Sequence, residues 1–421
     1  MKGGEMAFKV HTLSNGLRVV LYPESYRSAY MTLITRAGPR FERPEESGLS
    51  HIFEHLVVSD PEIHYEMESI GEGLSNAETD AEDVSYFFSF PKRNLLKGME
   101  AFARLWTASV SAADFERERT VIGIEYGGTG DLTPHTVADD LFMRTAWRGH
   151  PLGKNDTEPW QADLPNLTRE QFESFRRRVN CGRNAALAVV GEVPLPLFWK
   201  VLERSLGTLP EGELLPVVHQ PLPVREGFTV VKQAGAQKQA HCLLGFPLPR
   251  LLSAQRRALD VLGTYLGGES LFSSVLFRRV REEQALVYYI ASEVDSFYDS
   301  GAFKVYWTCP PANVEPVLNV VLGEIRRIAH GRISSEEFRR ARHVLALQKE
   351  SQLEEPLTVS MALAEELIRS GRVSNPNLWP KQARRARRAD LVRFAREHLN
   401  PERAVLALYG PVENLEPRIL V

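Results

Sequence analysis

The chain contains one pattern twice, and this internal repeat limits its possible folds more than any other feature of the sequence. SAADFERERTVIGIE at 111–125 resembles SSEEFRRARHVLALQ at 334–348 in register. Each half also ends with a polar helix, expected at about 168–178 and 388–398, and then an apolar segment closed by glycine, NAALAVVGEV or RAVLALYGPV. A repeat of this length indicates two copies of one domain rather than a single large core.

The two halves also share an order of expected elements. The first half is expected to form strands at LRVVLYP, SAYMTLITRAG, 73–79 and 83–90, and helices at about 45–58 and 62–71. The second half is expected to form strands at FTVVK, QAHCLLGFP, 286–293 and 302–307, and helices at about 252–266 and 270–282. This order predicts an α+β fold of two homologous domains, each a mainly antiparallel β-sheet covered by helices.

The boundary between the copies is expected in the segment LGTLPEGELLPVVHQPLPVREG, because its prolines and glycines interrupt any periodicity. We therefore expect a first domain at 1–206, a linker at 207–227 and a second domain at 228–421.

Composition and charge exclude several classes of function. The 51 Lys and Arg residues against 54 Asp and Glu residues give a net charge of −3, so no basic field attracts nucleic acid or an anionic membrane. The 3 cysteines are widely spaced, which predicts buried free thiols rather than a disulfide framework. No segment has the apolar length of a membrane span or of a secretory signal, so a cytoplasmic location is expected.

The strongest local signal is the motif His-x-x-Glu-His at 51–55, which follows a Pro-Glu-Glu run expected to form the first helical turn. On a helix His51 and His55 are four residues apart, so their imidazoles project from one face and can share one metal ion. Glu54 lies beside that metal without being an obvious ligand. This is the position expected for a general base that activates water at a metal.

A catalytic zinc ion usually has three protein ligands, and the repeat indicates the third. Glu118 and Glu125 lie two helical turns apart on one face in the first copy, whereas the second copy has Ala341 and Gln348 at the matching positions. We therefore predict Glu125 as the third ligand and Glu118 as an outer residue that orients a ligating histidine. One Zn²⁺ per chain is expected from this ligand set, while cobalt or manganese could support the same geometry.

These residues resemble the pitrilysin/insulinase family of zinc peptidases, in particular its two-domain members related to mitochondrial processing peptidase. The resemblance runs nearly from end to end. It is carried by 15–20 (NGLRVV), 51–55 (HIFEH), 116–125 (ERERTVIGIE), 150–153 (HPLG) and 184–191 (NAALAVVG). It implies a zinc ion on His51, His55 and Glu125, with Glu54 as the base and Glu118 in support.

The resemblance also implies residues that contact a substrate. Leu74, Asn76 and Ala77 match the strand on which family members lay an extended peptide by backbone hydrogen bonding, although Asn76 is equally typical of a turn. Arg281 and Tyr288 match the family's pair of donors, which would hold the substrate carbonyl and stabilise the oxyanion. Without the resemblance, the pair would be interpreted as a surface arginine and a half-buried strand tyrosine.

Two features depart from the family pattern. The segment after His55, LVVSDPEIHYEMESIGEG, is shorter than the usual connection, so the pocket of the first domain is expected to differ in shape. Glu78 stands where a large residue is frequent, which puts the usual substrate preference in doubt.

The sequence therefore predicts a zinc-dependent endopeptidase that hydrolyses extended peptides or unfolded segments between two domains that close as a clamshell. The resemblance implies a dimer. A homodimer is expected because one chain carries both sets of residues, and a heterodimer with a related chain, in a processing peptidase, is an alternative. The rival from another class is a non-catalytic structural or peptide-holding subunit, which would need neither the histidines nor the acids.

Overall fold

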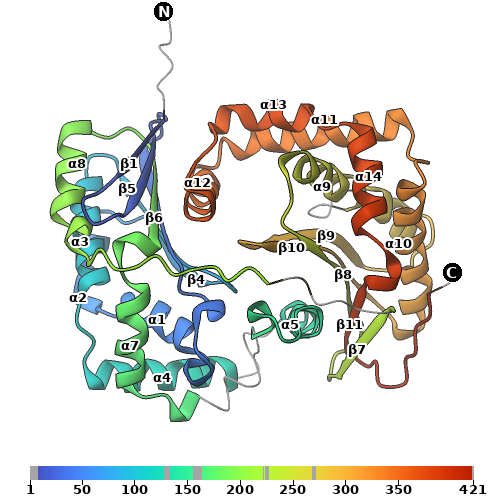
Figure 1. Ribbon diagram of the computed structural model, residues 1–421, viewed down its shortest axis with the longest axis horizontal. Helices are drawn as coiled ribbons and strands as arrows, with labels where there is room; N and C mark the ends of the chain where they lie inside the picture. Colours follow the sequence, from blue (N-terminus) through green and yellow to red (C-terminus); the bar gives the residue numbers. More distant parts are fainter. Residues whose placement is uncertain are drawn as a thin grey trace, which may run out of the picture. The chain divides into compact units, whose positions relative to one another are not determined.

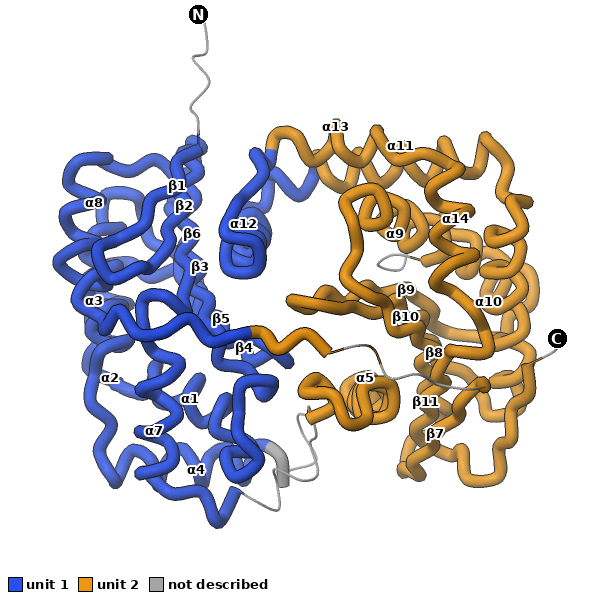
Figure 2. The backbone as a smooth tube through the Cα atoms, in the orientation of Figure 1, with its two compact units in different colours: residues 1–128, 157–216, 351–376 blue, residues 129–156, 217–350, 377–421 orange. Residues whose placement is uncertain are grey.

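The computed structural model describes residues 8–127, 133–154, 164–220, 222, 227–267 and 272–419. The chain divides into two compact units, shown in Figures 1 and 2. Unit 1 consists of Met1–Gly128, Thr157–Pro216 and Ser351–Pro376, and unit 2 consists of Thr129–Asp156, Val217–Glu350 and Asn377–Val421.

Unit 1 is built on a six-stranded sheet with the order β1-β2-β6-β3-β5-β4. Its strands are β1 (Lys9–Thr12), β2 (Arg18–Tyr22), β3 (Ser28–Thr35), β4 (Leu74–Thr79), β5 (Val84–Pro91) and β6 (Ala185–Val190). Only the β2–β6 pair is parallel among the described pairs, and β4 lies at one edge. The sheet is therefore mainly antiparallel, as the sequence predicted.

Helices bury both faces of this sheet. One face, which includes Leu187 and Val189, packs in a core with α1 (Leu49–Val57), α2 (Pro61–Ser69), α3 (Leu95–Thr107), α4 (Ala112–Gly127), α7 (Arg169–Val179) and α8 (Leu195–Arg204). The alternate residues Ala186 and Ala188 are equally buried, on the face where α12 (Pro356–Ser370) contacts β2, β3 and β6 (Figure 2). Burial on both faces explains why β6 is a continuous apolar run rather than an alternating one.

Unit 2 repeats this plan with a five-stranded sheet of order β7-β11-β8-β10-β9, in which only the described β7–β11 pair is parallel. The strands are β7 (Thr229–Ala234), β8 (Ala240–Pro249), β9 (Tyr289–Ser296), β10 (Ser300–Cys309) and β11 (Val405–Gly410). The main helices are α9 (Ser253–Leu266), α10 (Val314–Ala329), α11 (Ser335–Gln352), α13 (Trp379–Arg384) and α14 (Arg388–His398). The other face of the sheet is covered by α5 (Pro134–Ala146), which contacts β7, β8 and β11.

The helices α5 and α12 are exchanged between the two halves of the sequence. The buried Lys304 of β10 lies 2.7 Å from the carboxylate of Asp139 on α5, and the hydroxyl groups of Thr32 and Ser360 are 2.7 Å apart beneath α12. Neither helix was predicted from the sequence, so the contiguous domains expected at 1–206 and 228–421 did not include this exchange. The boundary at 207–227 stays a prediction.

The predicted fold class is confirmed, with differences at particular elements. The run Pro44–Glu46 forms a separate 3-10 turn rather than the first turn of α1, because Gly48 has φ 95° and interrupts the helical path. Cys181, Cys242 and Cys309 are buried free thiols, as expected. None of the helices in the described part of the chain combines the length and the apolar character that a membrane span requires.

The packing of α5 on β8 can be tested by a substitution where the two elements contact each other. Gly245→Ala would place a methyl group on the buried ring of Phe142 and should lower the free energy of unfolding by about 1–3 kcal/mol. Gly323→Ala is the matched control, because its added methyl group meets nothing within 4 Å on α10, and alanine should stabilise that helix by about 1 kcal/mol. Urea unfolding of both variants measures the two effects. Equal stabilities would contradict the close packing of α5 on this sheet.

Candidate metal centre

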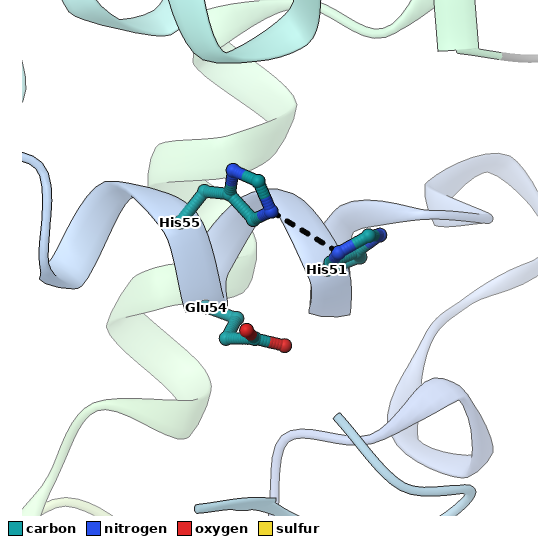
Figure 3. Close-up of side chains that lie close together, drawn as sticks. All are labelled: His51, Glu54 and His55. Atoms are coloured by element: carbon teal, nitrogen blue, oxygen red, sulfur yellow. Dashed lines mark hydrogen bonds between the residues drawn. The ribbon is translucent and has the colours of Figure 1, made fainter. Parts of the chain in front are cut away.

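The polar face of α1 carries three of the predicted residues. Leu49, Ile52, Phe53 and Leu56 are buried in the core of unit 1 at helical spacing, and this anchors the opposite side of the helix. His51, Glu54 and His55 lie on that opposite side, and Figure 3 shows the two imidazoles turned toward one another along the helix. A hydrophobic face therefore fixes the direction in which these three side chains project.

The start of α1 is held by a residue that the sequence analysis did not identify. The carboxylate of the buried Glu42 accepts hydrogen bonds from the backbone N–H groups of Gly48, at 3.2 Å, and Ser50, at 2.7 Å. It thus supplies the N-terminal cap that Gly48, without a side chain, cannot provide. Burial raises the pKa of Glu42 to about 7, against the opposing effect of these hydrogen bonds.

The helix α4 presents two acids on its inner face. Phe115 and Ile122 are buried at 1% and 0% exposure and fix that face against the core. Glu118 and Glu125 occupy the same stripe, since the four positions follow the spacing 3, 4 and 3. The stripe therefore presents the two acids on the same face as the apolar anchors, against α1, which contacts α4.

Three ligand atoms converge from these two helices. Nε2 of His51 and Nε2 of His55 are 3.2 Å apart, and Oε2 of Glu125 lies 3.7 Å from the first and 3.4 Å from the second. Ligands that bind one tetrahedral zinc ion at its usual bond lengths are separated by about 3.3–3.6 Å. The donor set and its spacing therefore fit three ligands of a tetrahedral zinc ion.

Glu118 contacts the outer side of this group. Its Oε2 lies 3.3 Å from Nδ1 of His55, so the carboxylate can accept a hydrogen bond from the ring nitrogen that points away from the ligand atoms. This contact would fix the tautomer and the ring orientation of His55, and it would raise the basicity of the ligating nitrogen.

The protonation of the group also suits a cation. Burial, and next the neighbouring His55, lower the pKa of His51 to about 3, so its imidazole is neutral at pH 7. Burial raises the pKa of Glu54, while a hydrogen bond of 2.5 Å from the hydroxyl of Thr79 acts in the opposite direction. Neutral imidazole is the form that binds a metal. Ligand atoms of His51, Glu54 and His55 all lie within 4.8 Å of one another, which places Glu54 beside the group.

The contact of Thr79 with Glu54 was missed at the sequence level, although a signal existed. Ala77 and Thr79 point to the same face of β4, because alternate residues of a strand share a face. That face lies toward α1, which contacts β4. The predicted strand therefore indicated that Thr79 shares a face with Ala77, but the contact of that face with α1 is known only from the structure.

The residues expected to hold a substrate lie on exposed elements. Leu74, Asn76 and Ala77 belong to the edge strand β4, in which Asn76 is exposed and pairs with Phe87, so Asn76 is not in a turn. The side chain of Leu74 lies outside the described residues. The edge strand could accept an added strand by backbone hydrogen bonding.

Arg281 and Tyr288 lie together in unit 2. The guanidinium carbon of Arg281 is 5.6 Å from the centre of the Tyr288 ring, and the tyrosine is 73% exposed rather than half-buried. The positions that match the acids of α4 are occupied differently in this unit. Ala341 is buried with Phe338 and Leu345 in the core, and the carbonyl oxygen of the Gln348 side chain lies 3.5 Å from the hydroxyl of Thr264. The metal-ligand pattern of α4 is thus absent from α11.

Comparisons with known proteins agree with this division. Residues 18–159 match the family described as Insulinase (Peptidase family M16), and residues 166–345 match the one described as Peptidase M16 inactive domain. An uncharacterized zinc protease of Streptomyces coelicolor is 30% identical over 347 residues, which cover 78% of this chain and 74% of the relative.

Two solved structures share the fold. The crystal structure of a protease from Helicobacter pylori has a TM-score of 0.87 at 23% identity and covers 96% of this chain and 100% of its own. A chain of complex III2 from Candida albicans, bound to Inz-5, has a TM-score of 0.82 at 16% identity, with 97% of both chains covered.

The contact between Glu118 and His55 predicts an effect on metal affinity. Glu118→Gln should weaken Zn²⁺ binding by about 10- to 100-fold, because an amide is a poorer acceptor for the ring N–H of His55. Glu116→Gln on the same helix is the matched control, since its side chain is 59% exposed and pairs with Arg119, and it should leave the affinity unchanged. Competition with a fluorescent zinc chelator measures both. Wild-type affinity in the Glu118 variant would exclude its role.

Proposed function

Because the chain belongs to the insulinase family, peptidase family M16, we propose that it is a zinc-dependent endopeptidase with its metal on His51, His55 and Glu125. The observation that carries the proposal is the convergence of the three ligand atoms of these residues at separations of 3.2–3.7 Å. A zinc ion held there would act as a Lewis acid toward a water molecule and a peptide carbonyl.

Glu54 is the proposed general base. Its carboxylate lies beside the two imidazoles, so it can take a proton from the attacking water and deliver that proton to the leaving amine. The hydroxyl of Thr79 donates to Oε2 of Glu54 and fixes the orientation of the carboxylate. Burial raises the pKa of Glu54, which makes the carboxylate a stronger base than an exposed glutamate.

The proposed substrate is an extended peptide or an unfolded segment. An edge strand reads mainly the backbone of an added strand, so β4 would bind such a segment with little dependence on its sequence. Exposed Glu78 on this strand would favour a basic or polar side chain at the neighbouring position. Arg281 and Tyr288 would donate to the carbonyl oxygen as negative charge develops on it. Closure of the two domains around the peptide, and assembly as a homodimer, complete the proposal.

A non-catalytic subunit is the competing function. The match to an inactive domain covers residues 166–345, where Ala341 replaces an acid of the first copy, and it does not include His51, Glu54, His55 or Glu125. A subunit that only holds a peptide has no need for these four residues together, so the peptidase is the better proposal.

The proposal is tested by elemental analysis of the purified protein, together with cleavage of a quenched fluorescent peptide library before and after chelation. One zinc ion per chain and chelator-sensitive cleavage would support the peptidase. Metal without cleavage would favour a peptidase that needs a related partner chain. No metal and no cleavage, even after zinc is added, would favour the non-catalytic subunit.

The proposed role of Glu54 as the general base can be tested by a single substitution. Glu54→Gln should retain zinc but lower kcat by about 10²- to 10⁴-fold, because an amide cannot accept the proton of the water. Glu62→Gln, at an exposed position of α2, is the matched control and should keep the wild-type rate. Metal content and peptide cleavage are measured on the same samples. Full activity of the Glu54 variant would rule out this residue as the base.

A further inference from the structure

We propose that Ala285 and Glu324 are positioning residues that hold Arg281 and Tyr288 side by side in unit 2. The inference deepens the proposed function and rests on it only where a substrate is concerned. The pair itself is observed, and four features of the surrounding backbone and side chains explain why it is held in place.

The first feature is a π-helical turn at Phe277–Glu282, which carries Arg281. The N–H of Glu283 donates to the carbonyl of Arg278 at 2.9 Å, which is the five-residue spacing of a π-helix. Such turns widen the helix and cost stability, and they occur frequently at functional sites.

The second feature is the backbone of Ala285. Its φ is 50°, the only positive value among the non-glycine residues that the structure describes. An alanine in this left-handed region is strained, since its Cβ approaches the following carbonyl. The conformation turns the chain back, so that the N–H of Leu286 donates to the carbonyl of Val280 at 2.9 Å. The strained residue therefore closes the turn between Arg281 and Tyr288.

The third feature is the packing of the pair. The guanidinium carbon of Arg281 lies 4.7 Å from the centre of the buried Phe277 ring and 5.6 Å from that of Tyr288, so the cation contacts two aromatic rings. The N–H of Tyr288 donates to the carbonyl of Thr308 on β10 at 3.3 Å. The Tyr288 side chain is 73% exposed, yet its backbone is tied to the sheet.

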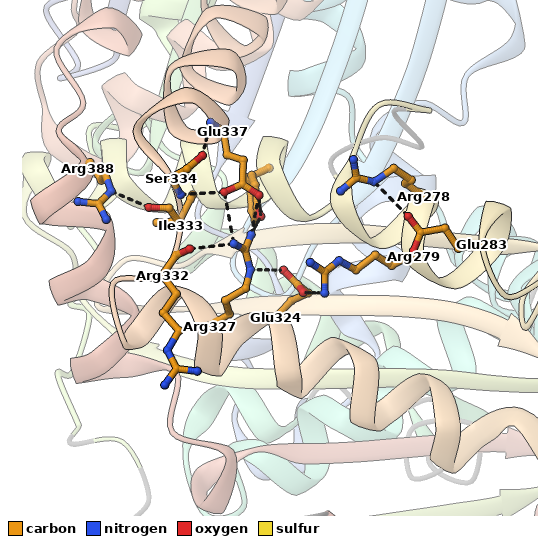
Figure 4. A network of polar contacts seen from close by, with 11 residues as sticks. Arg278, Arg279, Glu283, Glu324, Arg327, Arg332, Ile333, Ser334, Glu337 and Arg388 are labelled. Atoms are coloured by element: carbon orange, nitrogen blue, oxygen red, sulfur yellow. Dashed lines mark hydrogen bonds and ion pairs between the residues drawn. The ribbon is translucent and has the colours of Figure 1, made fainter.

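The fourth feature is an ionic anchor beneath the turn, shown in Figure 4. Arg279, two residues before Arg281, pairs with the carboxylate of Glu324, which is 2% exposed on α10. The same carboxylate lies 3.0 Å from Nε of Arg327, and Arg327 pairs with Glu337 of α11 at 2.8 Å. A buried carboxylate shared by two guanidinium groups is costly to break, because one partner would be left as an unpaired buried charge. The turn is thus fixed to two helices of the unit.

Together these contacts hold a half-buried donor, Arg281, and an exposed donor, Tyr288, in one geometry. Arg281 and Tyr288 would otherwise sample many rotamers, and that freedom would be lost only when a substrate binds. The strained turn and the buried anchor fix the backbone that carries the pair, and the contacts of Arg281 with the rings of Phe277 and Tyr288 restrict its side chain. Ala285 and Glu324 therefore act through Arg281 and Tyr288 and not on a substrate directly.

The test replaces Ala285 by a residue that cannot adopt its backbone conformation. Ala285→Val should lower kcat by about 10- to 100-fold with KM within twofold, because a β-branched residue is excluded at φ 50° and the donors move from their places. Ala285→Gly, which accepts this φ, should stay within about threefold of the wild type. Ala236→Val makes the same substitution at an exposed alanine without a positive φ and should behave as the wild type.

A double-mutant cycle separates positioning from a general loss of stability. In a background of Arg281→Ala and Tyr288→Phe, the further change Ala285→Val should have almost no effect on kcat, because the groups that it misplaces are already gone. An undiminished effect in that background would overturn the proposal. Arg279→Met is the second variant, and it should lower kcat in the same direction while Arg327 still pairs with Glu324.

A spectroscopic readout does not depend on catalysis. With 3-fluorotyrosine at position 288, the ¹⁹F resonance should shift in Ala285→Val toward its position in Arg281→Ala, and it should not shift in Ala236→Val. An unchanged resonance in Ala285→Val would overturn the positioning role. A shifted resonance in a protein that holds no zinc and cleaves no peptide, even after zinc is added, would instead refute the proposed function and leave the positioning role intact.

Discussion

Burial of both faces of each sheet is the constraint on which the rest of the structure depends. A sheet with two apolar faces needs helices on both sides, and in each unit one of those layers comes from the other half of the sequence. The helices on the other face of the sheet can then carry polar side chains as well as apolar ones. In unit 1 that layer contains α1, whose polar face carries two histidines opposite its apolar anchors, and α4, whose inner stripe combines apolar anchors with two acids. The candidate metal centre is therefore a polar cluster between two helices whose other contacts are apolar.

The two copies of the repeat have different side chains at equivalent positions of this helix. In α4 the inner stripe places Glu118 and Glu125 where α11 has Ala341 and Gln348. Acids and imidazoles at a helix contact lose hydration, and their burial is unfavourable unless they pair with one another or with a cation. The separations of 3.2–3.7 Å between these atoms let the groups pair with one another, and they also fit the zinc ion of the proposed function. Unit 2 has no such requirement, since Ala341 belongs to the apolar core and Gln348 is a neutral side chain that accepts a hydrogen bond from Thr264.

Spacing in the sequence predicted the local secondary structure and the faces of the helices, but not the contacts between distant segments. The repeat, the order of the strands and the helical faces of His51 and Glu125 follow from spacing alone, and all of these are local properties. Glu42 could not be found, because its carboxylate caps a helix that begins seven residues later, after a 3-10 turn that spacing does not reveal. The exchange of α5 and α12 was missed for a similar reason, since an amphipathic helix does not specify which sheet it will cover. The conformation of Ala285 could not be predicted from the sequence at all, because alanine has no preference for the left-handed conformation that its neighbours impose.

The two units also differ in how they hold their functional groups. The proposed metal ligands lie on packed helices, where a hydrophobic face fixes each side chain to a small range of positions, as α1 does for His51 and His55. The proposed donors Arg281 and Tyr288 lie instead on a π-helical turn and in the bend before β9, and such connecting segments are generally more mobile than packed helices. A buried ion pair and a strained residue supply the rigidity that the turn at Arg281 would otherwise lack. The second copy has Ala341 and Gln348 in place of the acids of the first, yet the proposed positioning of Arg281 and Tyr288 still requires a defined backbone there.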